Sequence, residues 1–239
     1  MTHTLSLHDA LPISAVTLHE LGRVALEEGD YPTARQYFQE ALAIKEAVLG
    51  RRHRSTAITL HGLGSVASAE GDYPTARQYL QEALEITEAV LGRRHHETAV
   101  TLHELGRVAL EEGDYPTARQ YLQEALAIKE AVLGRRHRET AVTLHELGYV
   151  AYAEGDYPTA RQYLAEALEI EEAVLGRRHL ETADTLLELG NVAYAEGDYP
   201  TVRQYFQEAL AIKEAVLGRR HLETMVMLIA YYSLTLIAS

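Results

Sequence analysis

The chain has 239 residues, of which 47% are hydrophobic and 24% charged, and it carries a formal net charge of −13. This composition is too apolar for an intrinsically disordered chain, and the acidic balance argues against a general binder of nucleic-acid phosphates. The absence of cysteine excludes disulfides and thiolate metal sites, and no apolar run reaches the length of about 18 residues that a membrane-spanning helix needs.

Residues 1–14 match no later part of the chain and lack the basic start and apolar run of a signal peptide. The stretch DALPI, from Asp9 to Ile13, resembles a translated sequencing-adapter end. We therefore expect a non-native leader, with the natural gene extending upstream of Met1, and an ordinary disordered tail is the alternative. The lack of a signal peptide and of cysteine favours a cytoplasmic location.

From residue 15 onward, two motifs recur with a period of 42 residues. GDYPTARQY begins at Gly29, Gly71, Gly113, Gly155 and, with one substitution, Gly197. LGRRH begins at Leu49, Leu91, Leu133, Leu175 and Leu217. Such a period indicates one supersecondary unit that stacks on its own copies. We predict a solenoid over residues 15–223, with units at about 15–55, 56–97, 98–139, 140–181 and 182–223, followed by an apolar terminal helix over 224–239.

Each unit is predicted to form two helices, as the third unit illustrates. Apolar residues such as Leu102 and Leu105 recur at helical spacing in its first half. Gly113 is expected to end this helix, because glycine readily adopts the left-handed conformation, and Asp114 is expected to cap the next one. The predicted core leucines are Leu60, Leu102, Leu144 and Leu186.

The spacing of small and large residues within a unit resembles the tetratricopeptide repeat. The matching positions of the third unit are Leu105, Gly106, Gly113, Tyr115, Ala118, Leu122 and Ala125. A 42-residue unit with LG-x-x-H between copies resembles the kinesin light chain type of this repeat. The resemblance implies an all-α, right-handed superhelical solenoid of antiparallel helix pairs, with about five and a half repeats. Only Asn191 matches the asparagine common on the groove-lining helices of that type, so we carry over the architecture and not the recognition of kinesin cargo.

By this resemblance, the first helix of each unit lines a concave groove, where a peptide or helix of a partner protein would bind. The residues at groove positions vary while GDYPTARQY barely changes, which is typical of a one-sided binding surface. Neutral drift on a solvated face is an equally good explanation. The candidate partner-binding residues are His19, Arg23, His61, Ser65, His103, Arg107, His145, Tyr149, Tyr152, Asn191 and Tyr194.

Charged turns suggest a second function, which is self-assembly into filaments or arrays. Arginines follow the second helices and acidic residues follow the first helices, so we expect a basic and an acidic edge on opposite sides of the stack. Local helix-end electrostatics explains the arginines equally well. The apolar run at the C-terminus is a further candidate contact. The assembly candidates are Arg51, Arg52, Arg93, Arg94, Glu111, Glu112, Met225, Met227, Ile229, Tyr231 and Tyr232.

Histidines raise the question of a metal site. One groove histidine per helix makes a poor zinc cage, because neighbouring helices lie about 8–10 Å apart. The linker histidines are predicted to cap or pack at the turns between repeats; they are His53, His95, His137, His179 and His221. We expect no metal, no cofactor and no enzymatic activity. A third hypothesis is a sensor fragment of a larger bacterial regulator.

Overall fold

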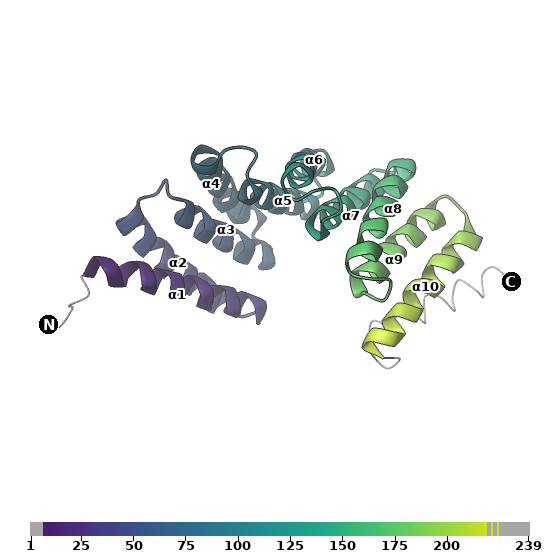
Figure 1. Ribbon diagram of the computed structural model, residues 1–239, viewed down its shortest axis with the longest axis horizontal. Helices are drawn as coiled ribbons and strands as arrows, with labels where there is room; N and C mark the ends of the chain where they lie inside the picture. The colour runs from purple at the N-terminus through teal and green to yellow at the C-terminus, as the bar shows by residue number, and fades with distance from the viewer. Residues whose placement is uncertain (1–6, 219–220, 222–223, 225–239) are drawn as a thin grey trace. The chain divides into compact units, whose positions relative to one another are not determined.

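The computed structural model describes residues 7–218, 221 and 224. Within this part of the chain there are ten α-helices and no strand, so the prediction of an all-α chain is confirmed (Figure 1). The helices are α1 (Leu7–Glu27), α2 (Tyr31–Leu49), α3 (Arg54–Ala69), α4 (Tyr73–Leu91), α5 (His96–Glu111), α6 (Tyr115–Val132), α7 (Arg138–Ala153), α8 (Tyr157–Val174), α9 (Leu180–Ala195) and α10 (Tyr199–Leu217). Because α1 begins at Leu7, it includes the second half of the segment 1–14 that the sequence sets apart.

The second helix of each repeat begins at an aspartate. The carboxylate of Asp114 accepts a hydrogen bond of 3.2 Å from the backbone N–H of Thr117, three residues along. This bond satisfies one of the free N–H groups of the first helical turn, so the predicted cap is confirmed. The same cap occurs at Asp30, Asp72, Asp156 and Asp198.

The first helix of most repeats begins at a linker histidine. The Nδ1 atom of His95 accepts a hydrogen bond of 3.2 Å from the backbone N–H of Glu97. His53, His137 and His179 cap α3, α7 and α9 in the same way. The predicted capping role is therefore confirmed for these four histidines.

Glycines separate the two helices of a repeat. Gly113 follows α5 with a φ of 76°, in the left-handed region that favours glycine. The backbone N–H of Asp114 then reaches back to the carbonyl oxygen of Ala109, at 2.9 Å. The turn therefore ends one helix and presents the aspartate that caps the next.

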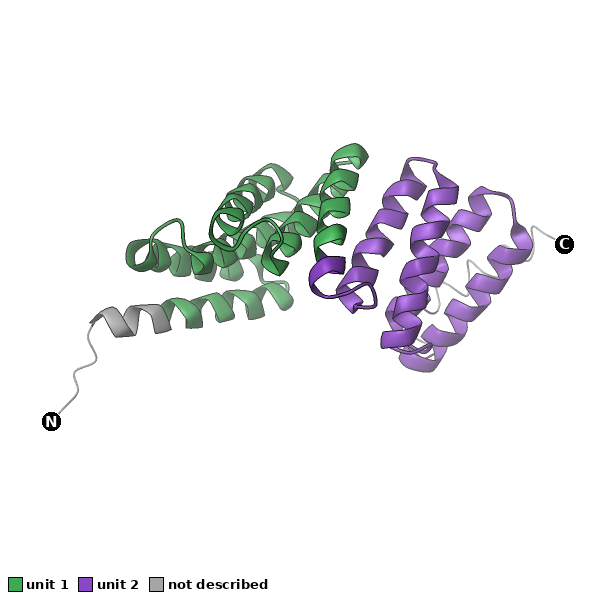
Figure 2. Cartoon of the chain, turned by 45° about the horizontal axis from the view of Figure 1, so that its top comes forward, with its two compact units in different colours: residues 1–128 green, residues 129–239 purple. Residues whose placement is uncertain are grey.

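The chain divides into two compact units between Ile128 and Lys129 (Figure 2). In unit 1, α1 packs on α2 and α3 packs on α4, and α2 and α4 also contact the first helix of the following repeat. In unit 2, α7 packs on α8 and α9 packs on α10, with α8 also contacting α9. Each unit is therefore built from helical hairpins that contact their neighbours along the chain.

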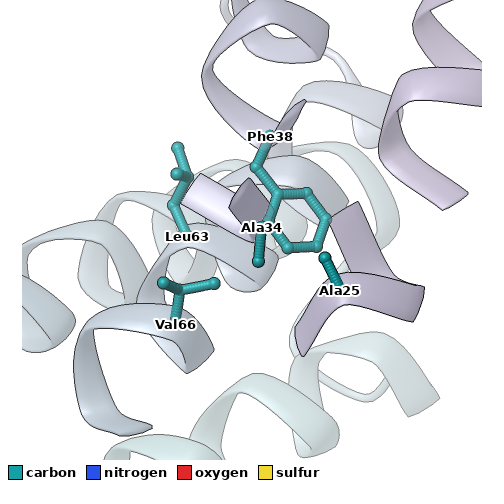
Figure 3. Packing of buried hydrophobic residues seen from close by; sticks show 5 residues of the cluster. All are labelled: Ala25, Ala34, Phe38, Leu63 and Val66. Carbon is teal, nitrogen blue, oxygen red and sulfur yellow. The ribbon is translucent and has the colours of Figure 1, made fainter. Parts of the chain in front are cut away.

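Phe38 shows how one hairpin is joined to the next in unit 1. Its ring lies among Ala25 of α1, Ala34 of α2, and Leu63 and Val66 of α3, all of them buried (Figure 3). Small residues let the ring approach both first helices. Unit 2 repeats this arrangement with Leu164 in place of the phenylalanine. The four core leucines predicted from the sequence are each 1% exposed, which confirms them.

The described helices differ from membrane-spanning segments in a simple respect. Each of them except α3, whose one charged residue is Arg54, carries three or more charged residues. Among the described residues, no helix combines the length and the apolar character needed to cross a bilayer.

Candidate functional site

Unit 1 contains a hollow of about 490 Å³ formed mainly by three first helices, α1, α3 and α5. Its walls include two predicted groove residues, Ser65 and Arg107, together with Leu26 and Ser68 from neighbouring groove positions. Tyr73, at the start of α4, completes one side. The structure therefore brings the first-helix positions of three successive repeats to one concave site.

The hollow combines apolar and charged groups. Leu26 and Tyr73 are half-buried and offer apolar surface. Arg107 is exposed, and its guanidinium lies 3.3 Å from the carboxylate of Glu104. Ser65 turns its hydroxyl back to the carbonyl oxygen of His61 at 3.2 Å, so this short side chain leaves the centre of the hollow open. Such a mixture can receive an apolar side chain and bond to polar groups beside it.

In unit 2 most of the corresponding positions carry tyrosines. Tyr149 of α7 and Tyr194 of α9 are 42% and 52% exposed. The Tyr194 ring packs edge-on against Tyr199 of α10 at 5.9 Å between ring centres, and the Tyr152 ring lies 5.8 Å from that of Tyr157 with the two ring planes tilted by 48°. Exposed tyrosines supply both apolar area and hydroxyl groups, as they do at many protein interfaces.

Two further groove candidates make local contacts with acidic side chains of their own helices. Asn191 of α9 donates a hydrogen bond of 3.3 Å to the Glu188 carboxylate. Arg23 of α1 lies between Glu20 and Glu27, at 3.2 and 3.3 Å. Both side chains remain at least partly accessible, so their predicted contact with a partner stays a prediction.

The groove histidines lie deeper than a contact surface requires. His103 is only 8% exposed. The Nδ1 atoms of His19 and His145 lie 3.3 and 2.9 Å from the hydroxyl oxygens of Thr59 and Thr185, each on the first helix of the next repeat. The structure thus places these histidines at the contact between neighbouring repeats, and their role in partner binding stays a prediction.

Burial also affects the charge of these histidines. Burial is the main cause, and the nearby Lys45 ammonium a second one, of a His19 pKa lowered to about 4. Burial lowers the pKa of His61 as well, although Glu104 opposes that shift. Both imidazoles are therefore neutral near pH 7.

A buried polar position on the second helices was not predicted from the sequence. Its residues are Lys45, Thr87, Lys129, Glu171 and Lys213, spaced 42 apart and all less than 8% exposed. The ammonium of Lys45 donates a 2.7 Å hydrogen bond to Thr59, and that of Lys129 donates a 3.1 Å bond to Thr143. The sequence did contain a signal for this position, because its residue changes charge from repeat to repeat while the rest of the second helix varies little.

The charged turns are largely paired within the chain. Arg51 bonds to Glu82 at 2.6 and 3.0 Å, and Arg93 bonds to Glu124 at 2.6 Å. Glu112, at the end of α5, forms an ion pair with Arg77. Arg52, Arg94 and Glu111 are exposed. The two charged edges are thus partly neutralised by contacts between successive repeats.

The remaining candidates concern the C-terminus and metals. Met225, Met227, Ile229, Tyr231 and Tyr232 lie outside the described residues, so the apolar terminal helix over 224–239 stays a prediction. Among the residues that are described, no three histidine or carboxylate side chains lie close enough together to hold a metal ion.

Comparison with protein families identifies the repeat. Residues 13–89, 59–131 and 132–229 match the family model described as tetratricopeptide repeat. No curated protein matches the chain. The matched segments together cover most of the sequence, including all ten helices from residue 13 onward.

Solved structures support the same fold. A putative kinesin light chain of Podosopora anserina with nearly identical TPR-like repeats has 23% identity and a TM-score of 0.74, over 86% of this chain and 97% of that one. BtubC (BKLC) of P. vanneervenii has 21% identity and a TM-score of 0.78, over 90% and 86%. Rap protein, complexed with competence and sporulation factor, has 16% identity and a TM-score of 0.69, over 94% and 66%. The chain thus shares its fold with kinesin-light-chain-like repeat proteins, and at these identities the likeness concerns the fold.

Proposed function

Because this chain belongs to the tetratricopeptide repeat family, we propose that it is an interaction scaffold that binds a peptide segment of a partner protein in the hollow of unit 1. The family's fold supports protein–protein interaction in general. The observation that carries the specific proposal is the hollow itself, with Leu26, Ser65 and Arg107 on three successive first helices.

The size and walls of the hollow suit a side chain of a bound peptide. Its volume of about 490 Å³ lies within the range of roughly 300–1,000 Å³ typical of ligand sites. An apolar side chain would contact Leu26 and Tyr73, while the flanking peptide groups would bond to Arg107 and Glu104. Rap protein, which has this fold, is complexed with a factor in its solved structure, so the fold is compatible with such a role.

The hollow is open because the second repeat has small serines at two groove positions. Ser65 and Ser68 stand where the third repeat has Arg107 and Leu110, and where the fourth has larger tyrosines. Filling the hollow from this position should block the peptide without disturbing the core. A tyrosine is tolerated at the equivalent position of the fourth repeat, which makes Ser65→Tyr a suitable variant.

A random peptide library selected on the purified chain tests the proposal. The best peptide is then measured against Ser65→Tyr, Arg107→Ala and the control Gln81→Ala, whose exposed side chain lies outside the hollow. We expect at least a tenfold loss of affinity, about 1.4 kcal/mol, in the first two variants and none in the control. Selected peptides that bind all three variants as tightly as the unmodified chain would refute the proposal.

A further inference from the structure

One buried position on a second helix of unit 2 carries an acidic residue where other repeats carry lysine or threonine. Glu171 of α8 occupies the position that Lys129 occupies one repeat earlier, and it is 3% exposed. Its Oε1 atom accepts a 3.0 Å hydrogen bond from the hydroxyl of Thr185. Its Oε2 atom is buried and has no hydrogen-bond partner among the described residues. A buried carboxylate oxygen without a hydrogen-bond partner is costly.

The hydrogen bonds around this carboxyl run in the opposite direction from those around the lysine. The Lys129 ammonium donates to the Thr143 hydroxyl, which in turn donates a hydrogen bond of 3.0 Å to the backbone oxygen of Glu139. The Thr185 hydroxyl instead donates to Glu171, so it accepts from Nδ1–H of His145 at 2.9 Å. Glu171 therefore presents an acceptor where the preceding repeat has a donor.

A cavity of about 140 Å³ adjoins this carboxyl. Its walls are Val142 and His145 of α7, Glu171 itself, and Glu181 and Asp184 of α9. The side chain of Asp184 is 54% exposed, so the cavity reaches the surface. Since a water molecule takes up about 30 Å³ in the liquid, the cavity has room for a small organic group.

The charges around the cavity do not balance. Glu181 is paired with Arg138, whose Nε donates at 3.1 Å, and Asp184 is paired with the Lys213 ammonium at 2.8 Å. Glu171, when ionised, is the third carboxylate, and none of the described residues forms an ion pair with it. The site is therefore short of one positive charge.

We propose that this cavity binds the ammonium group of a primary amine, such as a lysine side chain of a partner protein. The ammonium carries three donors and one positive charge, which the free Glu171 oxygen and the Asp184 carboxylate can receive. Val142 supplies apolar surface for the attached carbon chain. The bound amine would take the place of the ammonium that Lys129 contributes from within the chain one repeat earlier. This site lies in unit 2 and does not depend on the hollow of unit 1.

An NMR titration of the full chain tests the proposal. The probes are N-acetyl-lysine amide and N-acetyl-norleucine amide, which differ by the ammonium group. We expect the lysine probe alone to give saturable shifts of the Glu171 and Thr185 backbone amides. Equal shifts from both probes, or saturable shifts from neither, would overturn the proposal.

Two variants of Glu171 sharpen the test. Glu171→Gln removes the charge, and we expect at least a tenfold weaker affinity for the lysine probe. Glu171→Lys restores the residue of the preceding repeat and should abolish binding by filling the cavity with its own ammonium. Melting curves verify that both variants fold, which is expected because threonine and lysine stand at this position in other repeats. An unchanged affinity in folded Glu171→Gln contradicts the proposal.

A third comparison distinguishes the two sources of a primary amine. Putrescine represents free amines, and a lysine-containing peptide represents a partner protein. Tighter binding of the peptide assigns the site to a partner, whereas tighter binding of putrescine assigns it to a small molecule. Binding of neither is evidence against the proposal.

Discussion

At the scale of single residues, close helix packing depends on glycines inside the first helices. Gly106 of α5 faces Leu122 of α6, and a Cβ atom added to Gly106 would lie 2.7 Å from the Cγ atom of that leucine. Overpacking of this kind costs about 1–3 kcal/mol, while the better helix propensity of alanine returns about 0.8–1 kcal/mol. Gly106→Ala should therefore lower the free energy of unfolding by about 1 kcal/mol, measured by urea denaturation. The exposed change Gln123→Ala is the control, and equal stability of the two variants would refute the packing argument.

Glu171 makes stability depend on pH. The pKa of this carboxyl is raised to about 7 from an ordinary 4.5, mainly by burial and also by the carboxylates of Glu181 and Asp184, while the Thr185 hydrogen bond opposes the shift. The folded state holds the proton of Glu171 more tightly than the unfolded state does, so protonation of Glu171 stabilises the fold. This stabilisation is fully present below about pH 4.5 and is lost as the pH rises through 7.

The permanently neutral variant Glu171→Gln should therefore be more stable than the unmodified chain at pH 8, by about 1–2 kcal/mol, and similar to it at pH 4.5. Melting curves at the two pH values measure the difference. Glu169→Gln, at an exposed neighbouring position, should show no such change with pH. If Glu171→Gln raised the stability by the same amount at both pH values, the raised pKa of Glu171 would be contradicted.

At the scale of helices, a short-range rule sets the boundaries. Asp156 caps α8 by accepting from the backbone N–H of Thr159 at 3.3 Å. Asp156→Ala should destabilise unit 2 by about 1 kcal/mol, because that N–H group loses its partner. Asp156→Asn keeps an acceptor oxygen and serves as the control. Thermal melting of both variants checks the prediction, which fails if alanine and asparagine are equally stable.

The same short range explains what the sequence could predict. The residues that end and cap helices include Gly113, Asp114 and His95. Their hydrogen bonds reach at most five positions along the chain, so their roles could be predicted from their place within one repeat. Leu102 was predictable because the helical spacing of apolar residues defines the buried face.

Contacts between repeats could not be predicted from the sequence. Arg77 pairs with Glu112, 35 residues later, which accounts for an acidic residue at a helix end where the helix dipole disfavours it. Lys129 reaches a threonine on the next helix, and His103 is buried although a groove position was expected for it. These features depend on how neighbouring hairpins stack, which no local pattern specifies.

At the scale of the whole molecule, arginine pairs recur from repeat to repeat. They are Arg51–Glu82, Arg93–Glu124, Arg135–Glu166 and Arg177–Glu208. Since these guanidinium groups already have carboxylate partners, we do not expect them to drive self-assembly. Light scattering at low and high salt should give the same mass for the unmodified chain and for the double variant Arg51→Gln, Arg93→Gln. An assembly that forms at low salt and is lost in this variant would restore the charged edges as assembly surfaces.

Site-directed photo-cross-linking shows whether the hollow of unit 1 receives a partner. A photoreactive amino acid is placed at exposed Glu111, on the wall of the hollow, or at exposed Gln81 outside it, and the selected peptide is added before illumination. We expect a covalent peptide adduct from position 111, suppressed by excess unlabelled peptide, and none from position 81. An adduct from position 81 alone would contradict the proposed binding in the hollow.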